Sequence, residues 1–133
     1  MTVSVTRLKL RSPRFLLPFV VYALRSARQA KRSPGNVATG VTRDRHGAFW
    51  TRSVWTDQAS MRGFMMSGVH RKAMPRLLDW CDEASLVHWE QDSAVLPEWD
   101  AAHRRLVTEG RPSKVRHPSP AHESLDFPPP NRR

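Results

Sequence analysis

A single histidine, His70, is the strongest candidate for chemistry in this sequence. It follows Gly68, where a helical pattern breaks, and it precedes Met74 by about one helical turn. A neutral imidazole can take a proton from a weak acid or bind a metal through its free nitrogen. The alternative is a structural histidine that caps or orients the break at Gly68. The sequence leaves both interpretations open.

Arg52 is the second candidate, because it lies in the middle of an expected strand on the same face as Trp50 and Val54. If that face is turned inward, the guanidinium needs an anionic partner, such as a ligand oxygen or an acidic side chain. If it is turned outward, Arg52 is a solvated residue that extends along its neighbours. His88 lies on a later strand, on the face of Leu86, where a packing role is favoured over a ligand contact.

Aromatic and methionine side chains could line an apolar pocket beside these residues. Flat rings suit aromatic ligands, and methionine adapts its shape to an irregular cavity. The same side chains at strand or helical spacing also form ordinary core. The candidate lining residues are Trp50, Trp55, Phe64, Met74, Trp80 and Trp89.

Other classes of site are not indicated. The sequence has no H-x-x-x-H, C-x-x-C or phosphate-loop motif, so no metal site is predicted. Its one cysteine, Cys81, excludes an internal disulfide and a Cys-rich zinc site, and we expect an inert buried thiol. A single cysteine fits a reducing, cytoplasmic location. No segment reaches the roughly 20 apolar residues of a membrane span.

These residues must be positioned by a mixed set of elements. The 133 residues are expected to form one domain with tails. Alternating hydrophobicity predicts strands near 3–10, 36–43, 48–55 and 83–90. Helical periodicity predicts helices over 13–32, 57–67, 69–81 and 97–109. Pro18 should kink the first helix, Pro75 should bend or restart the third, and a turn over 44–47 should join two strands into a hairpin.

The order strand, helix, strand, strand, helix, strand predicts an α+β, ferredoxin-like antiparallel sheet with helices on one face. Both faces of this sheet are apolar, because Phe49 and Trp55 alternate with Trp50 and Val54. Each large side chain left in water would forfeit about 1.5–3 kcal/mol. We therefore expect a second copy of the sheet to cover the face without helices, which predicts a homodimer.

Charge is concentrated at the two ends of the chain. The net charge is +10, with nine Lys or Arg and no acidic residue up to Arg43, and eight basic against ten acidic residues over 44–110. Six prolines in the last 23 residues predict a disordered, basic tail over 111–133 after a folded domain over 1–110. The basic ends could bind nucleic acid or an anionic membrane, or they could merely keep the protein soluble.

Several segments together carry a resemblance to a known family. They are residues 15–17, 28–29, 33–35, 49–55, 61–64 and 67–74, within a region of about 10–91. With the predicted order of elements, this sequence resembles the dimeric α+β barrel superfamily. Within it, the chain is most similar to small antibiotic-biosynthesis-monooxygenase-like and spheroidene-monooxygenase-like proteins.

The resemblance implies a pocket between the concave sheet and the second helix, and an oxidoreductase of the monooxygenase type that acts on a hydrophobic aromatic or polyene ligand. His70 would be its catalytic residue. Some family members need no cofactor, and haem is the alternative. Where the haem-degrading branch is expected to carry its axial histidine this sequence has Met74, whereas Gly68 and His70 match a Gly-x-His of the spheroidene-type branch. A non-catalytic ligand- or haem-binding module would use the same pocket.

Overall fold

The structure is a computed structural model that describes residues 1–131. Its centre is a five-stranded antiparallel sheet with the strand order β2-β3-β1-β4-β5. The strands are β1 (Thr2–Leu10), β2 (Asn36–Arg43), β3 (Phe49–Trp55), β4 (Cys81–Glu90) and β5 (Arg111–Pro112). The predicted α+β ferredoxin-like fold is therefore confirmed.

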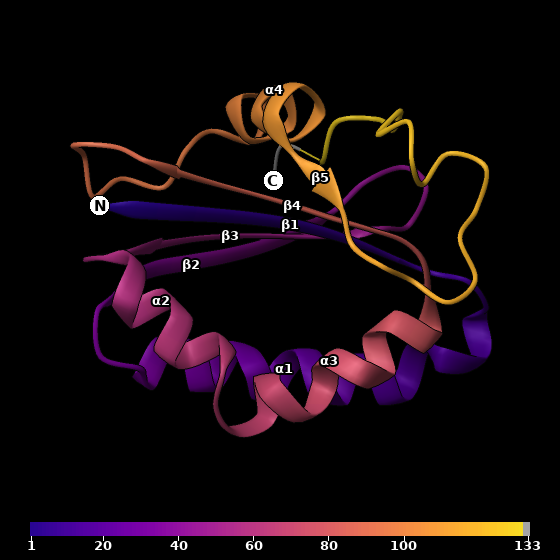
Figure 1. The fold of residues 1–133 in the computed structure, drawn as a ribbon, viewed down its shortest axis with the longest axis horizontal. Helices are drawn as coiled ribbons and strands as arrows, with labels where there is room; N and C mark the ends of the chain where they lie inside the picture. The colour runs from indigo at the N-terminus through magenta and orange to yellow at the C-terminus, as the bar shows by residue number, and fades with distance from the viewer. Residues whose placement is uncertain (132–133) are drawn as a thin grey trace.

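Helices cover both faces of this sheet. The helices are the 3₁₀ turn η1 (Pro13–Phe15), α1 (Leu16–Arg32), α2 (Gln58–Met65), α3 (Gly68–Trp80) and α4 (Trp99–Glu109). Helices α1, α2 and α3 form a layer below the sheet, and α4 lies above it, while the C-terminal segment after β5 passes close to the end of α3 before it rises again (Figure 1). The sheet is thus the middle of three layers.

The two prolines that were expected to distort helices are accommodated without breaking them. The α-helical part of the first helix begins at Leu16, after a 3₁₀ turn, so Pro18 falls in its first turn. Backbone N–H groups of a first turn have no partner within the helix, and a proline there removes no hydrogen bond. Pro75 lies inside α3, which continues from Gly68 to Trp80.

The sheet turns two different surfaces to its covering layers. Strand β1 places Val3 and Val5 on the upper face and Ser4 and Thr6 on the lower face, since side chains alternate along a strand. The upper face packs against α4 in one apolar cluster. This cluster contains Val3, Val5, Trp50, Val54, Val87, Trp99, Ala102, Leu106 and Phe127.

The upper face differs from expectation, because the chain covers it with its own residues. The C-terminal segment, which the sequence predicted to be disordered, first passes the end of α3, where Arg116 donates its backbone N–H to Leu78, and then reaches the upper face with Phe127, which is 8% exposed. His122, between the two, is 4% exposed. His122 is held by the N–H of Ala84 and the carbonyl of Ser113. Composition alone misled, because a few large side chains suffice to fix a proline-rich segment on an apolar surface. The last two predicted tail residues, 132 and 133, lie outside the described residues.

A buried ion cluster fixes the same face near the β2–β3 turn. The Arg7 guanidinium donates to Asp44 at 2.9 Å and to Glu83 at 2.8 Å, and Phe127 lies over it at 4.4 Å. Trp50 also donates to Asp44, at 2.9 Å. Burial raises the pKa of Asp44, but the hydrogen bonds from Trp50 and Arg7 outweigh it and hold this pKa below its ordinary value.

Within the described residues, no helix is both long enough and apolar enough to cross a bilayer.

Candidate functional site

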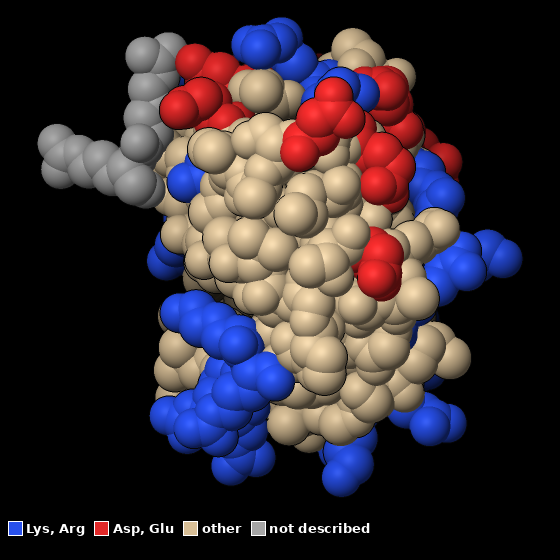
Figure 2. All heavy atoms as spheres, turned by 90° about the vertical axis from the view of Figure 1, so that its left-hand side faces the viewer, with Lys and Arg blue, Asp and Glu red and all other residues tan. Residues whose placement is uncertain are grey.

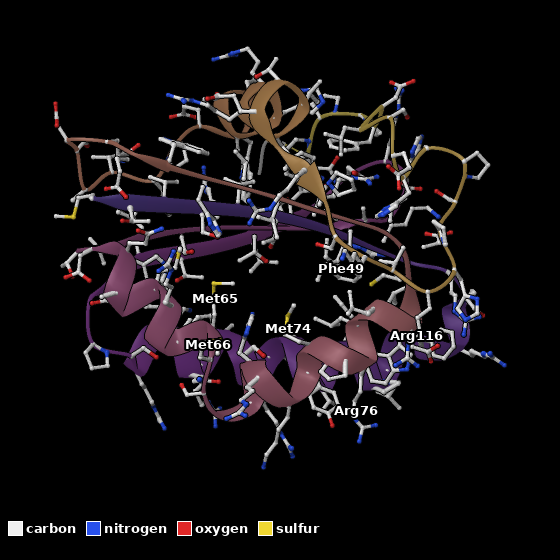
Figure 3. The ribbon with its side chains drawn as sticks, viewed as in Figure 1. Phe49, Met65, Met66, Met74, Arg76 and Arg116 are labelled. Carbon is white, nitrogen blue, oxygen red and sulfur yellow. The ribbon has the colours of Figure 1, made fainter. Side chains whose placement is uncertain are left out.

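A cavity of about 200 Å³ lies between the lower face of the sheet and the helices α1, α2 and α3. Its lining is mainly apolar, and Met65 and Met74 extend toward it from α2 and α3 (Figure 3). An engineered apolar cavity of about 150 Å³ holds benzene, so the volume here suits a compact ring compound. The family resemblance implied a pocket between the sheet and the second helix, and that this cavity is a ligand site stays a prediction.

The side of the cavity that the sheet forms, which we call its floor, carries polar side chains in rows across the strands. Strand register places Thr39, Ser53, Ser4 and His88 side by side across four neighbouring strands. The next row, two residues further along β1 toward its C-terminal end, includes Thr6 and Thr51. Hydroxyl groups at the bottom of an apolar pocket can orient a ligand through its own hydroxyl or carbonyl group.

His70 lines the cavity from the first turn of α3. Its Nδ1 lies 3.1 Å from the carbonyl oxygen of Met65. A carbonyl can only accept a hydrogen bond, so Nδ1 carries the proton when the ring is neutral. The lone pair of Nε2 is then available as a base or a ligand.

Burial favours this neutral form. Burial lowers the pKa of His70 below its ordinary value, and the hydrogen bond to Met65 opposes the shift only in part. The pKa of His88, on the floor, is also lowered, first by burial and then by the positive charges of Arg111 and Arg62. The pocket therefore holds two imidazoles that are neutral near pH 7.

An aromatic wall stands beside His70. The Phe64 ring centroid lies 4.7 Å from that of His70, and the Trp55 ring stacks on Phe64 with a centroid distance of 5.2 Å. Trp55 is fixed in turn by a 3.0 Å hydrogen bond from its indole to Ser53. A flat ligand beside this wall would lie next to the free nitrogen of His70.

The turn between α2 and α3 is held by Gln29 of α1. The Gln29 amide donates to the carbonyl of Ser67 at 2.8 Å, and its oxygen accepts the backbone N–H of His70 at 2.9 Å. Gly68 has a φ of +58°, and a Cβ at this position would lie 3.0 Å from the Gln29 amide nitrogen. Glycine is therefore required both for the turn and for the close approach of Gln29.

Five residues predicted for the site line this cavity. They are His70, Trp55, Phe64, Met74 and His88. That they contact a ligand or take part in a reaction stays a prediction.

Four predicted lining residues lie elsewhere. Trp50, Arg52 and Trp89 are on the upper face, because the alternation of β3 and β4 turns them away from α1–α3. Arg52 donates to the carbonyl of Pro97 and lies 4.1 Å from the Trp99 ring.

The fourth of these residues, Trp80, ends α3, stacks with Phe15 and packs at a tilt against Tyr22, and it does not line the cavity. These four residues have structural partners in place of the ligand contacts that were expected.

Sequence reasoning missed the floor hydroxyls and Gln29. The alternation of Val3 and Val5 with Ser4 and Thr6 could have indicated a polar inner face, but a polar residue on a strand usually signals solvent. No local pattern marks Gln29, because its contacts are 35 to 41 residues away along the chain.

The cavity does not fit haem. Nε2 of His70 could serve as an axial ligand, but drug-sized ligands occupy pockets of about 300–1,000 Å³, which exceeds the volume here. Among the described residues, no Lys or Arg lines the cavity to pair with propionates.

Comparison with known families decides the relationship of the chain. Residues 17–111 match the family model described as Domain of unknown function (DUF3291), which is more than half of the sequence. The chain belongs to the DUF3291 family. No curated protein matches it in sequence.

Solved structures place this DUF3291 protein among antibiotic biosynthesis monooxygenase-like folds. SnoaB, a cofactor-independent oxygenase from Streptomyces nogalater, is 20% identical with a TM-score of 0.58, over 73% of this chain and 97% of SnoaB. A proposed antibiotic biosynthesis monooxygenase from Deinococcus radiodurans is 16% identical with a TM-score of 0.63, over 71% and 96%. A similar protein from Nitrosomonas europaea is 14% identical with a TM-score of 0.62, over 70% and 100%. The expected resemblance is confirmed at the level of fold.

Proposed function

We propose that this DUF3291 protein is an oxidoreductase of the monooxygenase type that acts on a compact aromatic ligand in the cavity above α1–α3. The observation that carries the proposal is His70, a half-buried imidazole whose pKa is lowered, whose Nδ1 donates to the carbonyl of Met65 and whose Nε2 is left free beside an aromatic wall. The fold of a cofactor-independent oxygenase supports the reaction class.

The role assigned to His70 is that of a general base. Transfer of a proton from a phenolic O–H, or from a C–H activated by a neighbouring carbonyl, to Nε2 leaves an electron-rich carbon in the ligand. Such a carbon can react with dioxygen by itself. When a CH₂ group becomes a carbonyl, one oxygen atom of dioxygen stays in the product and the other leaves as water with the two hydrogens of the CH₂ group. The ligand itself supplies all the electrons that reduce dioxygen, so the reaction needs no separate reductant.

The volume of the pocket selects among the expected ligands. A cavity of about 200 Å³ favours one or two fused rings over a long polyene. The hydroxyls of Ser4, Thr6 and Thr51 on the floor would bind the oxygen substituents of such a ring. The mainly apolar side chains that α1, α2 and α3 turn toward the cavity would exclude water from the reacting carbon.

The test is oxygen uptake by the purified protein with a panel of one- and two-ring phenols whose keto form carries a CH₂ group beside the carbonyl. We expect His70→Gln to abolish uptake while ligand binding, followed by tryptophan fluorescence, is retained. His46→Gln, on the exposed β2–β3 turn, is the matched control and should leave uptake unchanged. Uptake that survives in His70→Gln would remove His70 from the reaction. Binding without uptake by the unmodified chain would favour a non-catalytic binding module.

The homodimer and the cytoplasmic location stay predictions. The argument for the dimer was an uncovered apolar face, and α4 together with Leu125 and Phe127 of the C-terminal segment covers that face here. A dimer would therefore have to use another surface, or exchange α4 and the C-terminal segment between two copies.

A further inference from the structure

The outer surface of the helix layer combines strong positive charge with exposed aliphatic side chains. Helices η1, α1, α2 and α3, all within the described residues, carry nine Lys or Arg and one acidic residue, Asp79. All nine basic residues are exposed: Arg14, Arg25, Arg28, Lys31, Arg32, Arg62, Arg71, Lys72 and Arg76. By contrast, α4 carries two arginines and two acidic residues.

The figures show that this charge faces away from the sheet. In Figure 2 the lowest third of the molecule, where the helix layer of Figure 1 lies, shows Lys and Arg and no Asp or Glu. Arg76 points outward from α3, on the side opposite the cavity (Figure 3). The excess positive charge therefore lies on the helix layer below the sheet, whereas α4, on the other face, carries equal numbers of arginines and acidic residues.

An aliphatic stripe runs along α1 through this basic surface. Leu17, Val21 and Leu24 recur at i, i+4 and i+7, so they share one face of the helix. They are 76%, 40% and 67% exposed, and Leu16 beside them is 39% exposed. Scattered exposed apolar residues are ordinary, but a helical stripe of them flanked by cations is the pattern of a helix that lies in a membrane interface.

We propose that this surface binds an anionic lipid bilayer, with α1 lying parallel to the membrane, its leucines in the headgroup–acyl boundary and its arginines on lipid phosphates. Charge complementarity selects a polyanionic partner. The exposed apolar side chains of this surface are mainly aliphatic. The aromatic rings of Phe15, Tyr22 and Trp80 on the same helices are half-buried against one another, whereas sites for single-stranded nucleic acid expose such rings for stacking. The bilayer is therefore favoured over a nucleic acid, and the inference does not depend on the chemistry of His70.

The experiment is cosedimentation of the full chain with phosphatidylcholine vesicles that contain or lack phosphatidylglycerol. We expect binding to the anionic vesicles only, and a steep loss of binding as salt is raised. Arg25→Gln with Arg28→Gln should weaken binding by roughly thirtyfold, since each cation near such a surface contributes about a fivefold factor. Leu17→Gln with Leu24→Gln should weaken it by about tenfold or more.

Matched controls come from the other side of the molecule. Val95 is as exposed as Leu17, at 72%, and lies in the loop before α4. Val95→Gln, and Arg45→Gln with Arg104→Gln, should leave vesicle binding unchanged, as should His70→Gln. Circular dichroism confirms that each variant is folded.

Three outcomes would overturn the proposal. The first is equal binding, or none, with both kinds of vesicle. The second is salt-sensitive binding to an RNA or DNA oligonucleotide that the two leucine substitutions do not weaken, which would assign the surface to nucleic acid. The third is a dimer in solution that those substitutions dissociate, which would assign the leucine stripe to a second copy of the chain.

Discussion

Gln29 and His70 lie on different helices, 41 residues apart, and the side-chain oxygen of Gln29 accepts the backbone N–H of His70 at 2.9 Å. The amide of the same side chain donates to Ser67 at 2.8 Å and to Phe64 at 3.3 Å. One side chain of α1 therefore fixes both the end of α2 and the start of α3. Because the His70 ring is itself bonded to Met65, in the same turn, the position of its free Nε2 depends on Gln29.

Replacement of Gln29 by Ala should release this turn. We expect the free energy of unfolding to fall by about 2 kcal/mol, because partly buried backbone groups lose their partners. The pKa of His70 should rise toward its ordinary value as water reaches the ring. Urea denaturation and an NMR titration of the imidazole measure the two effects. Gln58→Ala, on the exposed start of α2, is the control, and a Gln29→Ala variant that titrates like the unmodified protein would show that Gln29 does not position His70.

The lowered pKa of His70 predicts the pH dependence of both stability and the proposed activity. For a base whose pKa is lower in the folded state, the stabilisation is present above the unfolded-state pKa of about 6.5 and is lost as pH falls toward the folded-state value. Oxygen uptake should persist to a pH below 6.5 and then fall with one proton, because only neutral His70 accepts a proton. His70→Gln should flatten the stability curve in this window, although His88 still contributes. A titration of His70 above its ordinary pKa would contradict the assignment.

The sequence predicted the parts of the fold that depend on short-range patterns. The alternation of Phe49 and Trp55 with Trp50 and Val54 correctly separated the two faces of β3, and the break at Gly68 correctly marked the boundary between α2 and α3. Which face looks into the pocket is decided by the covering helices, which no local pattern specifies. For that reason Trp50 and Arg52 were assigned to the pocket although they lie under α4.

The C-terminal segment shows a second limit. Proline lacks an N–H and lowers the cost of ordering a chain without regular structure, so a proline-rich sequence can be either disordered or laid down on a surface. The decision rests on anchors such as Phe127 and His122, whose partners Arg7 and Ala84 are remote in sequence. The sequence indicated an apolar sheet face that must be covered, and in the structure α4 and Phe127 of the C-terminal segment cover it.

Cys81 should be unreactive in the folded protein. Burial, with a smaller contribution from Asp82, raises the pKa of its thiol to about 12, so at pH 8 the thiolate is about one part in ten thousand. A thiol reagent such as DTNB should react with it only after unfolding in urea. Val95→Cys introduces an exposed thiol in the same chain and should react at once. Rapid labelling of Cys81 without denaturant would mean that the end of α3 opens readily.

Phe127 should be the main anchor of the C-terminal segment. It packs edge-on against Trp50 at 5.7 Å between ring centroids and lies 4.4 Å from the Arg7 guanidinium. Phe127→Ala should lower the free energy of unfolding by about 3 kcal/mol, the lower end for a buried phenylalanine. Val95→Ala, at an exposed position, should change it by less than about 0.5 kcal/mol.

Removal of residues 111–133 would test whether the C-terminal segment as a whole protects the upper apolar face of the sheet. Trp50, Val54 and Val87 would lose part of their covering layer, and an exposed apolar patch of this kind promotes association. We expect the shortened chain to bind the dye ANS and to sediment as a dimer or larger species, while the full chain binds little dye. If both chains sediment alike and bind dye equally, the C-terminal segment does not protect this face in solution, and the upper layer rests on α4 alone.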